Sequence, residues 1–384
     1  MTGFTPEEIS RRGHPIWAEV DLAAISHNIT ELKARASGAE VMGVVKGYAY
    51  GHGNPASALA MLAGGATRLG VARVAEALHL RDAGVAVPIH VFSEPPPDAA
   101  AALVDKDITA TIYTSGFARA LSGAAAAAGR RVPVHVKLDT GMHRVGLQEG
   151  DLADAVRELR SLPGLEIEGA WSHLAVADQL GHPFTRKQLD LFHDLVRRVE
   201  GDGIRLRYKH IANSAATLAM PESHLDLVRC GIAAYGLWPA PDFVGTADLH
   251  PAMTLRARIS MVKEVPAGDA VSYGLNYELE RASRVVTVSA GYADGYDRRL
   301  SGTAEILIRG ERHTVSGTVC MDQFMVDVGD RDVAVGDVVT LLGRDGSEEI
   351  RAEELADLIG TINYEVTTRI PSRVPRIYRE GSAA

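Results

Sequence analysis

The fold of this chain is decided by Val41-Met-Gly-Val-Val45 and the adjoining Lys46-Gly-Tyr-Ala-Tyr-Gly-His-Gly53. The residues before Lys46 are mostly apolar and predict a buried strand, whereas the glycines and polar residues after it predict a loop. Lys46 therefore lies at the carboxyl end of a strand, where parallel barrels place their chemistry. A lysine that is desolvated there can lose its proton and form a Schiff base with a carbonyl compound. Because a lone lysine in this position more often closes an ordinary surface strand, the rest of the chain has to decide.

Strand-like runs recur along the first two-thirds of the chain. They comprise residues 41–45, 68–72, 88–92, 108–113, 132–138, 167–173, 209–212 and 227–233. Amphipathic segments such as 115–128 and 185–199 separate them, and Asp21 can cap a helix. Eight strands alternating with helices over about 240 residues match a (β/α)8 TIM barrel, an α/β fold, in number and length. A doubly wound open sheet is the structural alternative, but it normally needs fewer strands.

The pattern changes after Pro251. The strand-like runs there are 253–265, 284–289, 304–308, 325–328 and 337–342, followed by one helical segment at 352–359. Short glycine turns, rather than helices, connect these runs. The sequence therefore predicts a barrel over residues 1–250 and a separate, mainly β domain over residues 251–384.

Composition restricts the partners and the compartment. With 46% hydrophobic and 23% charged residues among 384, the chain has an ordinary globular composition. Its net charge of -9 argues against nucleic acid or an anionic membrane as partner. Only Cys230 and Cys320 occur, which fits a reducing cytosol better than a disulfide framework. Without a secretory apolar segment near the start or an apolar run of about 20 residues, we expect a soluble, cytoplasmic protein.

Polar residues follow the seventh and eighth predicted barrel strands. Asn213-Ser-Ala-Ala-Thr217 ends the seventh, and Leu227-Val-Arg-Cys-Gly-Ile232 brings Gly231 near the same place. Barrels often bind phosphate at this position through backbone N–H groups. A Schiff-base lysine and a phosphate cradle together suggest pyridoxal phosphate, whose ring nitrogen also needs a partner. Arg229 is the natural partner, because its guanidinium can donate to that nitrogen but cannot protonate it.

Four further segments carry chemistry. In Lys137-Leu-Asp-Thr-Gly-Met-His-Arg144, Arg144 could receive a substrate carboxylate. His173 ends the sixth predicted barrel strand, Tyr273 lies in a glycine-flanked turn, and Cys320-Met-Asp322 follows a strand. Although the chain holds 14 histidines, no HxH or HExxH pair lies at a strand end, which argues against a metal hydrolase.

Taken together, these residues resemble the alanine racemases, the fold-type III pyridoxal-phosphate enzymes, from about residue 14 to residue 379. The matching segments are 45–53, 137–146, 212–217, 228–233, 291–295, 319–323 and 362–365. One departure is visible, because the residues after Lys46 are Gly47-Tyr48, where the family usually has a small residue and then Asn or Asp.

The resemblance implies a role for each matching residue. Lys46 would be the Schiff-base lysine and one catalytic base, and Tyr273 the opposite base. The cofactor would be held by Tyr50, His173, Asn213, Ser214, Arg229, Gly231, Ile232 and Tyr364. Arg144 and Met321 would meet the substrate carboxylate, while Lys137, a position often carbamylated in the family, and Asp322 would support them.

The resemblance also implies a reaction and an assembly. The enzyme would interconvert L-alanine and D-alanine by two-base exchange of the α-proton and supply D-alanine for cell-wall peptidoglycan. It would be a homodimer whose active sites combine the barrel of one subunit with the β domain of the other. The alternatives are a racemase of another small amino acid such as serine, and a barrel-type pyridoxal-phosphate carrier or decarboxylase.

Overall fold

The computed structural model describes residues 8–9 and 12–381 and divides into two compact units. The barrel unit consists of Ala24–Ala49 and Asn54–His250. The β unit consists of the described residues up to Ala23, of Tyr50–Gly53, and of those from Pro251 onward.

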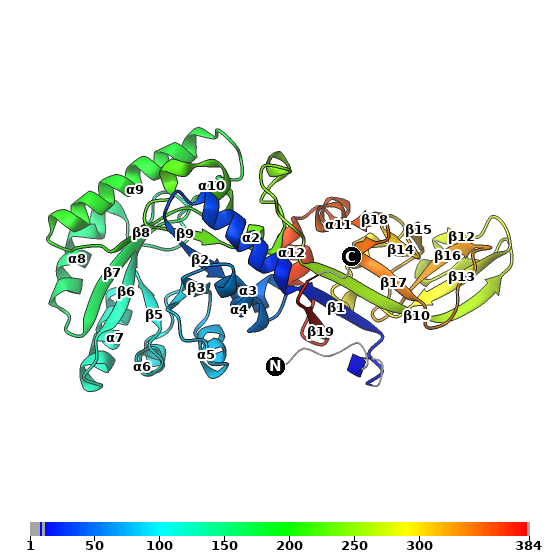
Figure 1. Cartoon of the computed structure of the whole chain (residues 1–384), viewed down its shortest axis with the longest axis horizontal. Helices are drawn as coiled ribbons and strands as arrows, with labels where there is room; N and C mark the ends of the chain where they lie inside the picture. The colour runs from blue at the N-terminus through cyan, green and yellow to red at the C-terminus, as the bar shows by residue number, and fades with distance from the viewer. Residues whose placement is uncertain (1–7, 10–11, 382–384) are drawn as a thin grey trace. The chain divides into compact units, whose positions relative to one another are not determined.

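The barrel unit is built on eight parallel strands in the order β8-β7-β6-β5-β4-β3-β2-β9. The strands are β2 (Glu40–Val44), β3 (Arg68–Val71), β4 (Ile89–Val91), β5 (Thr109–Ile112), β6 (Val132–Lys137), β7 (Leu165–Trp171), β8 (Tyr208–His210) and β9 (Leu227–Cys230). The two ends of this order also meet, because the amide of Arg229 donates to the carbonyl of Ala212 at 3.1 Å. The predicted TIM-type barrel is confirmed, with all eight strands at the predicted places (Figure 1).

Helices surround these strands (Figure 1). They are α2 (Leu22–Arg35), α3 (Lys46–Tyr50), α4 (Ala56–Ala63), α5 (Val74–Asp82), α6 (Ala100–Asp105), α7 (Ser115–Ala127), α8 (Leu152–Ser161), α9 (Pro183–Gly201) and α10 (Ser214–Ala219). The longest, α9, buries one stripe that includes Leu189, Phe192 and Leu195 and leaves the opposite face charged. In the described part of the chain, no helix combines the length and apolarity needed to cross a membrane.

Strands β3, β4, β5 and β9 are buried along their whole length, as is usual for parallel strands covered on both faces, although each also contains a polar residue. Side chains from neighbouring strands fill the interior closely. A Cβ on Gly70 would lie 2.3 Å from the ring of Phe92, so only glycine leaves room for that ring.

The β unit is a mainly antiparallel sheet in the order β18-β17-β14-β15-β16-β13-β10-β1-β19. Its strands are β1 (Ile16–Asp21), β10 (Met253–Val265), β13 (Ser283–Val288), β14 (Glu305–Ile308), β15 (Glu311–Ser316), β16 (Phe324–Gly329), β17 (Val338–Asp345), β18 (Glu348–Ile350) and β19 (Arg376–Arg379), with β11 (Ala270–Val271) and β12 (Tyr277–Glu278) forming a small hairpin. Helices α11 (Ala352–Ile359) and α12 (Asn363–Thr368) follow β18. The 13-residue β10 pairs with β1, β13 and β17 and organises the sheet.

Two segments that the predicted partition assigned to the barrel, within residues 1–250, belong to the β unit. Strand β1 pairs antiparallel with β10 and parallel with β19, so its backbone completes that sheet. Residues Tyr50–Gly53 join the same unit because Arg376 donates two hydrogen bonds to the carbonyl of Gly51, at 2.9 and 2.6 Å. Both assignments depend on partners more than 200 residues away, which local pattern does not reveal.

Candidate active site

Lys46 lies at the carboxyl end of a barrel strand, as predicted, one residue after β2 ends at Val44. The loop that it opens is fixed to neighbouring elements. The amide of Val45 donates to the carbonyl of Gly70 at 2.8 Å, and the amide of Gly47 donates to Glu76 Oε1 at 2.6 Å. Lys46 is therefore flanked on both sides by backbone that other strands and helices hold in place.

The surroundings of Lys46 favour its neutral form. Burial lowers the pKa of the lysine most, and the guanidinium charges of Arg144 and Arg229 lower it further, against an opposing effect of Glu76. A neutral amine can attack a carbonyl carbon or accept a proton, which an ammonium group cannot do.

The residues after Lys46 form a left-handed turn. Gly47, Tyr48 and Ala49 have φ between 56° and 61°. This conformation costs glycine nothing but strains a residue with a side chain, and Asn or Asp would adopt it more readily than Tyr48. The departure from the family pattern therefore lies in a strained, half-buried turn beside the lysine.

Arg229 lies on β9 and is only 4% exposed. Its Nη1 donates to His210 Nδ1 at 3.0 Å, and its Nη2 to His173 Nδ1 at 3.1 Å. The backbone carbonyls of Ser172 and Ile211 also accept from Nη2. Burial and the charge of Arg144 lower the pKa of Arg229 to about 9, so the guanidinium remains charged at neutral pH.

Three residues that the sequence analysis did not single out extend this contact through the barrel interior. His210 Nε2 lies 2.8 Å from His135 Nδ1, and His135 Nε2 lies 3.1 Å from Glu168 Oε2. His135 and His210 are fully buried. Arg229 is thus connected through two histidines to a carboxylate, and we call these four residues the histidine chain.

The donors in the histidine chain are fixed by its first member. An arginine can only donate, so His210 Nδ1 accepts and His210 carries its proton on Nε2. His135 Nδ1 then accepts from His210, and His135 Nε2–H donates to Glu168. Burial lowers the pKa of both histidines, which keeps them neutral at physiological pH.

Glu168 supplies the negative charge of this network. Burial by itself would raise the pKa of Glu168, but its hydrogen bond with the neutral His135 and the charge of Arg68 outweigh that effect and lower it. The guanidinium of Arg68, which is 3% exposed, lies 3.6 Å from the same carboxylate. One carboxylate therefore faces two buried guanidinium groups, one directly and one through the histidine chain.

Lys137 ends β6 and is 2% exposed. Its Nζ donates to the carbonyl of Leu138 at 2.8 Å and lies 5.0 Å from the centre of the Trp171 ring. Burial lowers the pKa of Lys137 to about 7, assisted by the charges of Arg229 and Arg144 against that of Asp139. Close to neutral pH a large part of this lysine is an uncharged, nucleophilic amine.

The loop after β6 carries Arg144 and is organised by Asp139. The amides of Gly141 and His143 donate to Asp139 Oδ1 at 3.0 and 3.1 Å. Arg144 itself is exposed. The predicted recipient of a carboxylate therefore extends from a fixed loop into accessible space, and its charge acts on Lys46, Lys137 and Arg229.

The two loops predicted to bind an anion lie against each other. Asn213 Oδ1 caps α10 by accepting from the amide of Ala216 at 3.0 Å. Ser214 Oγ accepts from the amide of Gly231 at 2.9 Å, which joins the loop after β8 to the loop after β9. Ile232 follows Gly231 and begins a 3-10 turn. A hydroxyl and backbone amides at this place can bind a phosphate.

Tyr50 and Tyr364 belong to the β unit, where their ring centres lie 6.1 Å apart. Burial and the neighbouring Tyr364 raise the pKa of Tyr50, so its phenol stays protonated. A protonated phenol can donate a hydrogen bond to an anion.

Tyr273 also belongs to the β unit, and 73% of the residue is exposed. Thr318 Oγ1 donates to the carbonyl of Tyr273 at 2.8 Å, and Ser272 Oγ donates to the carbonyl of Thr318 at 2.5 Å. The backbone of Tyr273 is therefore fixed to the segment that leads to Cys320, while its phenol extends outward.

The chain neighbours of Tyr273 and Met321 contact each other, since Ser272 Oγ is 3.6 Å from Cys320 Sγ. Asp322 accepts from Arg373 Nη2 at 2.6 Å, and Arg373 Nε donates to Asp294 at 2.7 Å. The structure thus groups Tyr273, Met321 and Asp322 in the β unit. It groups Lys46, Lys137, Arg144, His173, Asn213, Ser214, Arg229, Gly231 and Ile232 in the barrel unit.

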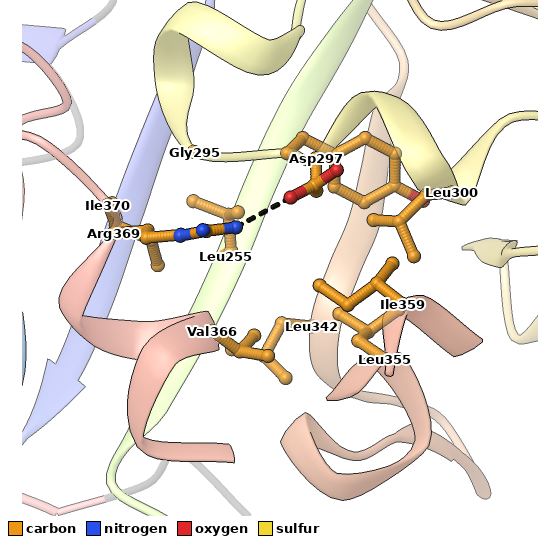
Figure 2. A pocket seen from close by; sticks show the side chains of 11 residues that line it. Leu255, Gly295, Asp297, Leu300, Leu342, Leu355, Ile359, Val366, Arg369 and Ile370 are labelled. Atoms are coloured by element: carbon orange, nitrogen blue, oxygen red, sulfur yellow. Dashed lines mark hydrogen bonds and ion pairs between the residues drawn. The ribbon is translucent and has the colours of Figure 1, made fainter. Parts of the chain in front are cut away.

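A pocket in the β unit lies outside this set of residues (Figure 2). It is lined by apolar side chains such as Leu255, Leu342 and Leu355, and an ion pair of 2.6 Å joins Asp297 to Arg369 beside them. Its volume of about 20 Å³ is close to that of one water molecule. This pocket is too small for a substrate or cofactor.

Two family models match consecutive parts of the chain. Residues 20–239 match the model for the alanine racemase N-terminal domain, and residues 252–378 match that for the C-terminal domain. The alanine racemase of Carboxydothermus hydrogenoformans is 44% identical over 366 residues, which cover 95% of this chain and 99% of the relative.

Solved structures of racemases superpose on nearly the whole chain. The alanine racemase of Streptomyces lavendulae superposes with a TM-score of 0.92 at 41% identity, covering 96% of this chain and 98% of that one. The histidine racemase of Leuconostoc mesenteroides superposes with a TM-score of 0.87 at 30% identity, covering 95% and 98%. This architecture thus carries racemases that differ in the amino acid they are named for.

We predict that Lys137→Met changes how stability depends on pH. Between the folded pKa of about 7 and the ordinary value of 10.5, the unfolded chain binds a proton at Lys137 that the folded chain does not. The free energy of unfolding of the native protein therefore increases as the pH rises across this window, and that of the methionine variant lacks this increase. Urea unfolding in CO2-free buffer measures the difference. Lys187→Met, at an exposed position on α9, is the control, and parallel profiles for all three proteins would contradict the prediction.

A second prediction concerns the anionic end of the histidine chain. Glu168→Gln keeps a hydrogen-bond acceptor for His135 but removes the charge that faces Arg68 and Arg229. Because it leaves buried positive charge uncompensated, we expect the free energy of unfolding to fall by about 2–4 kcal/mol. Glu166→Gln, at an exposed position of the same strand, should stay within about 0.5 kcal/mol of the native protein in the same urea titration. Equal stability of the two variants would show that the carboxylate does not balance these charges.

Proposed function

The chain belongs to the alanine racemase family, a family of isomerases, and we propose that it interconverts L-alanine and D-alanine with pyridoxal phosphate as cofactor. The observation that carries the proposal is that the desolvated Lys46 lies on the same barrel as the cradle formed by Ser214 and Gly231. Burial lowers the pKa of Lys46, and the charges of Arg144 and Arg229 lower it further. An aldehyde cofactor with a phosphate group needs both an amine and an anion site.

The residues present fit this cofactor. Lys46 would bind its aldehyde carbon, Arg229 its ring nitrogen, and Ser214 with the Gly231 and Ile232 amides its phosphate. Asn213 supports the cradle by capping α10, and Tyr50 and Tyr364 are phenols suited to the same anion. When bound, the cofactor supplies an electron sink for the carbon that loses its proton.

Arg229 would limit that electron sink. Its guanidinium stays protonated and donates, so a ring nitrogen beside it receives a hydrogen bond without receiving the proton. His173 and His210 accept from Arg229 and hold its plane. We infer that this chain favours proton exchange over the side reactions that a protonated ring would promote.

Racemisation needs a base on each face of the substrate carbon, because a single base would have to move. The amine of Lys46 would serve one face, and the phenol of Tyr273 the other. Arg144 and the Met321 backbone would receive the substrate carboxylate, with Asp322 anchoring the Met321 loop through Arg373. Fixing the carboxylate fixes which carbon bond faces each base.

Lys137 would support Arg144. An amine with a pKa of about 7 can react with carbon dioxide near neutral pH, and the resulting carbamate is an anion. This charge would offset the positive field of Arg144 and Arg229 and orient the exposed Arg144 toward substrate.

We further propose a homodimer in which Tyr273 of the partner subunit completes each active site. Exposure of large side chains on the β unit supports this, since Tyr273 is 73% and Met321 54% exposed in the single chain. Exposed apolar and aromatic groups that gather on one unit are typical of protein interfaces.

The proposal extends to the use of the product and to the compartment. D-alanine would serve cell-wall peptidoglycan, and the unpaired cysteines Cys230 and Cys320 fit the reducing cytoplasm. A second candidate is racemisation of another amino acid. The relative named as a histidine racemase and the unusual Tyr48 beside Lys46 both favour testing other substrates.

The decisive experiment measures exchange of the α-proton with deuterium from solvent. Lys46→Ala should keep the fold but lose covalent cofactor and turnover. Tyr273→Phe should slow exchange by about 10²-fold or more for L-alanine and much less for D-alanine, because each base serves one enantiomer. Serine and histidine, assayed in parallel, test the second candidate. Native turnover in Lys46→Ala, or equal exchange of both enantiomers in Tyr273→Phe at the native rate, would refute the mechanism.

Subunit exchange tests the assembly. Lys46→Ala and Tyr273→Ala proteins are each expected to be inactive, since every site lacks one base. In a dimer with shared sites, mixing them creates hybrids with one complete site and one site without either base, so activity should return. If mixing under exchange conditions restores no activity while labelled subunits do exchange, each subunit houses both bases and the shared site is wrong.

A further inference from the structure

A second histidine cluster lies on the surface of the barrel unit. The rings of His27, on α2, and His250 stack with their centres 4.2 Å apart and their planes 10° from parallel. The carboxylate of Asp248 faces both, with Oδ2 3.2 Å from His27 Nε2 and Oδ1 3.2 Å from His250 Nε2. The ligand atoms of these three residues all lie within 4.8 Å of one another.

These distances match the edges of a metal coordination shell. Charge-assisted hydrogen bonds are typically about 2.7–2.9 Å long, shorter than the two 3.2 Å contacts. Bonds of about 2.0–2.1 Å from zinc to nitrogen give a tetrahedral ligand-to-ligand edge of about 3.3 Å. The backbone carbonyl of Asp248 lies 2.9 Å from His27 Nε2 and offers a further oxygen on the same side. The donor set is two imidazoles and oxygen, which suits zinc and its first-row neighbours.

The backbone beneath the cluster is held from the inside. Asn28, next to His27, is fully buried, and its Oδ1 accepts from the amide of His250 at 2.8 Å. Its Nδ2 donates to the carbonyls of His250 at 2.9 Å and Ala234 at 3.2 Å. A single amide side chain therefore fixes the backbone positions from which His27 and His250 extend. Because this backbone is already ordered, binding an ion costs little further conformational entropy.

The other group of histidines with this spacing, among the residues that the structure describes, is His90, His135 and His210 in the barrel interior. Both nitrogens of His135 and His210 are already used in the histidine chain. The charges of Arg68 and Arg229 act on all three rings and would repel a cation. The surface cluster instead presents a carboxylate, on a chain whose net charge is -9.

We propose that His27, Asp248 and His250 form a binding site for a late first-row divalent metal ion of the zinc type. In the metal-free protein, His27 Nε2–H donates to the Asp248 carbonyl. Metal binding moves the Nε2 protons to Nδ1 through solvent, which reaches side chains that are 38% and 55% exposed. The imidazoles stay neutral, and each ring turns about its soft terminal torsion to direct its lone pair at the ion. The ion then fastens α2 to the segment 248–250.

Titration of the holoenzyme with Zn²⁺ tests the site. The protein is first treated with a chelator and kept free of amino acids, which bind metals themselves. We compare the native protein with the double variant His27→Gln/His250→Gln and with His79→Gln, a control at an exposed position on α5. The native and control proteins should bind one equivalent of Zn²⁺ more than the double variant, and each single variant should bind at least about tenfold more weakly. Their Tm should rise with Zn²⁺, whereas that of the double variant should not.

Racemase activity provides the check on folding, because none of these three residues is placed in the catalytic machinery. The double variant should retain native turnover. If it does not fold, Asp248→Asn removes the charged ligand with little change of shape and should lose the same equivalent. Equal Zn²⁺ stoichiometry in the native protein and in a folded variant would overturn the proposal and leave the cluster as a hydrogen-bonded clamp.

Discussion

The charge of Arg229 inside the barrel is the constraint on which the rest of the site depends. A buried guanidinium is costly unless an anion compensates it, and Glu168 reaches it only through two neutral histidines. With Arg68 drawing on the same carboxylate, the interior keeps a surplus of positive charge. Burial lowers the pKa of both Lys46 and Lys137 most, and the charges of Arg229 and of the exposed Arg144 lower both further. The arginine that the polar network fixes is therefore one of the causes that favour two neutral amines.

The same field suits the ligands that the proposed reaction brings. A phosphate group and a substrate carboxylate are both anions, so they enter a region where the protein has positive charge but few carboxylates of its own. Such preorganised charge stabilises a developing carbanion without rearrangement during the reaction. The strained turn at Gly47–Ala49 lies at the edge of this field, which makes it the place where substrate preference can differ from that of relatives.

The sequence was sufficient for the parts of the structure whose causes are local. Parallel strands buried on both faces produce short, mostly apolar runs, and each barrel strand lies where such a run was expected, with ends shifted by a few residues. Strand β1 was missed because its pairing with β10 and β19 joins residues far apart in the chain. His135, His210 and Glu168 were missed for a similar reason. Their contact depends on the register of three strands, and the available sign was only a polar residue within an apolar run.

The two histidine clusters show why residue type alone does not give chemistry. In the interior, His135 and His210 lie between the guanidinium of Arg229 and the carboxylate of Glu168. Each ring accepts a hydrogen bond from the arginine side and donates one toward the carboxylate, so both of its nitrogens are occupied. At the surface, His27 and His250 converge on one carboxylate, with solvent available to move their protons. The first arrangement excludes a cation by charge and by occupied nitrogens, whereas the second offers it nitrogen, oxygen and a negative charge. The sign of the neighbouring charge decides between a structural relay and a metal ligand.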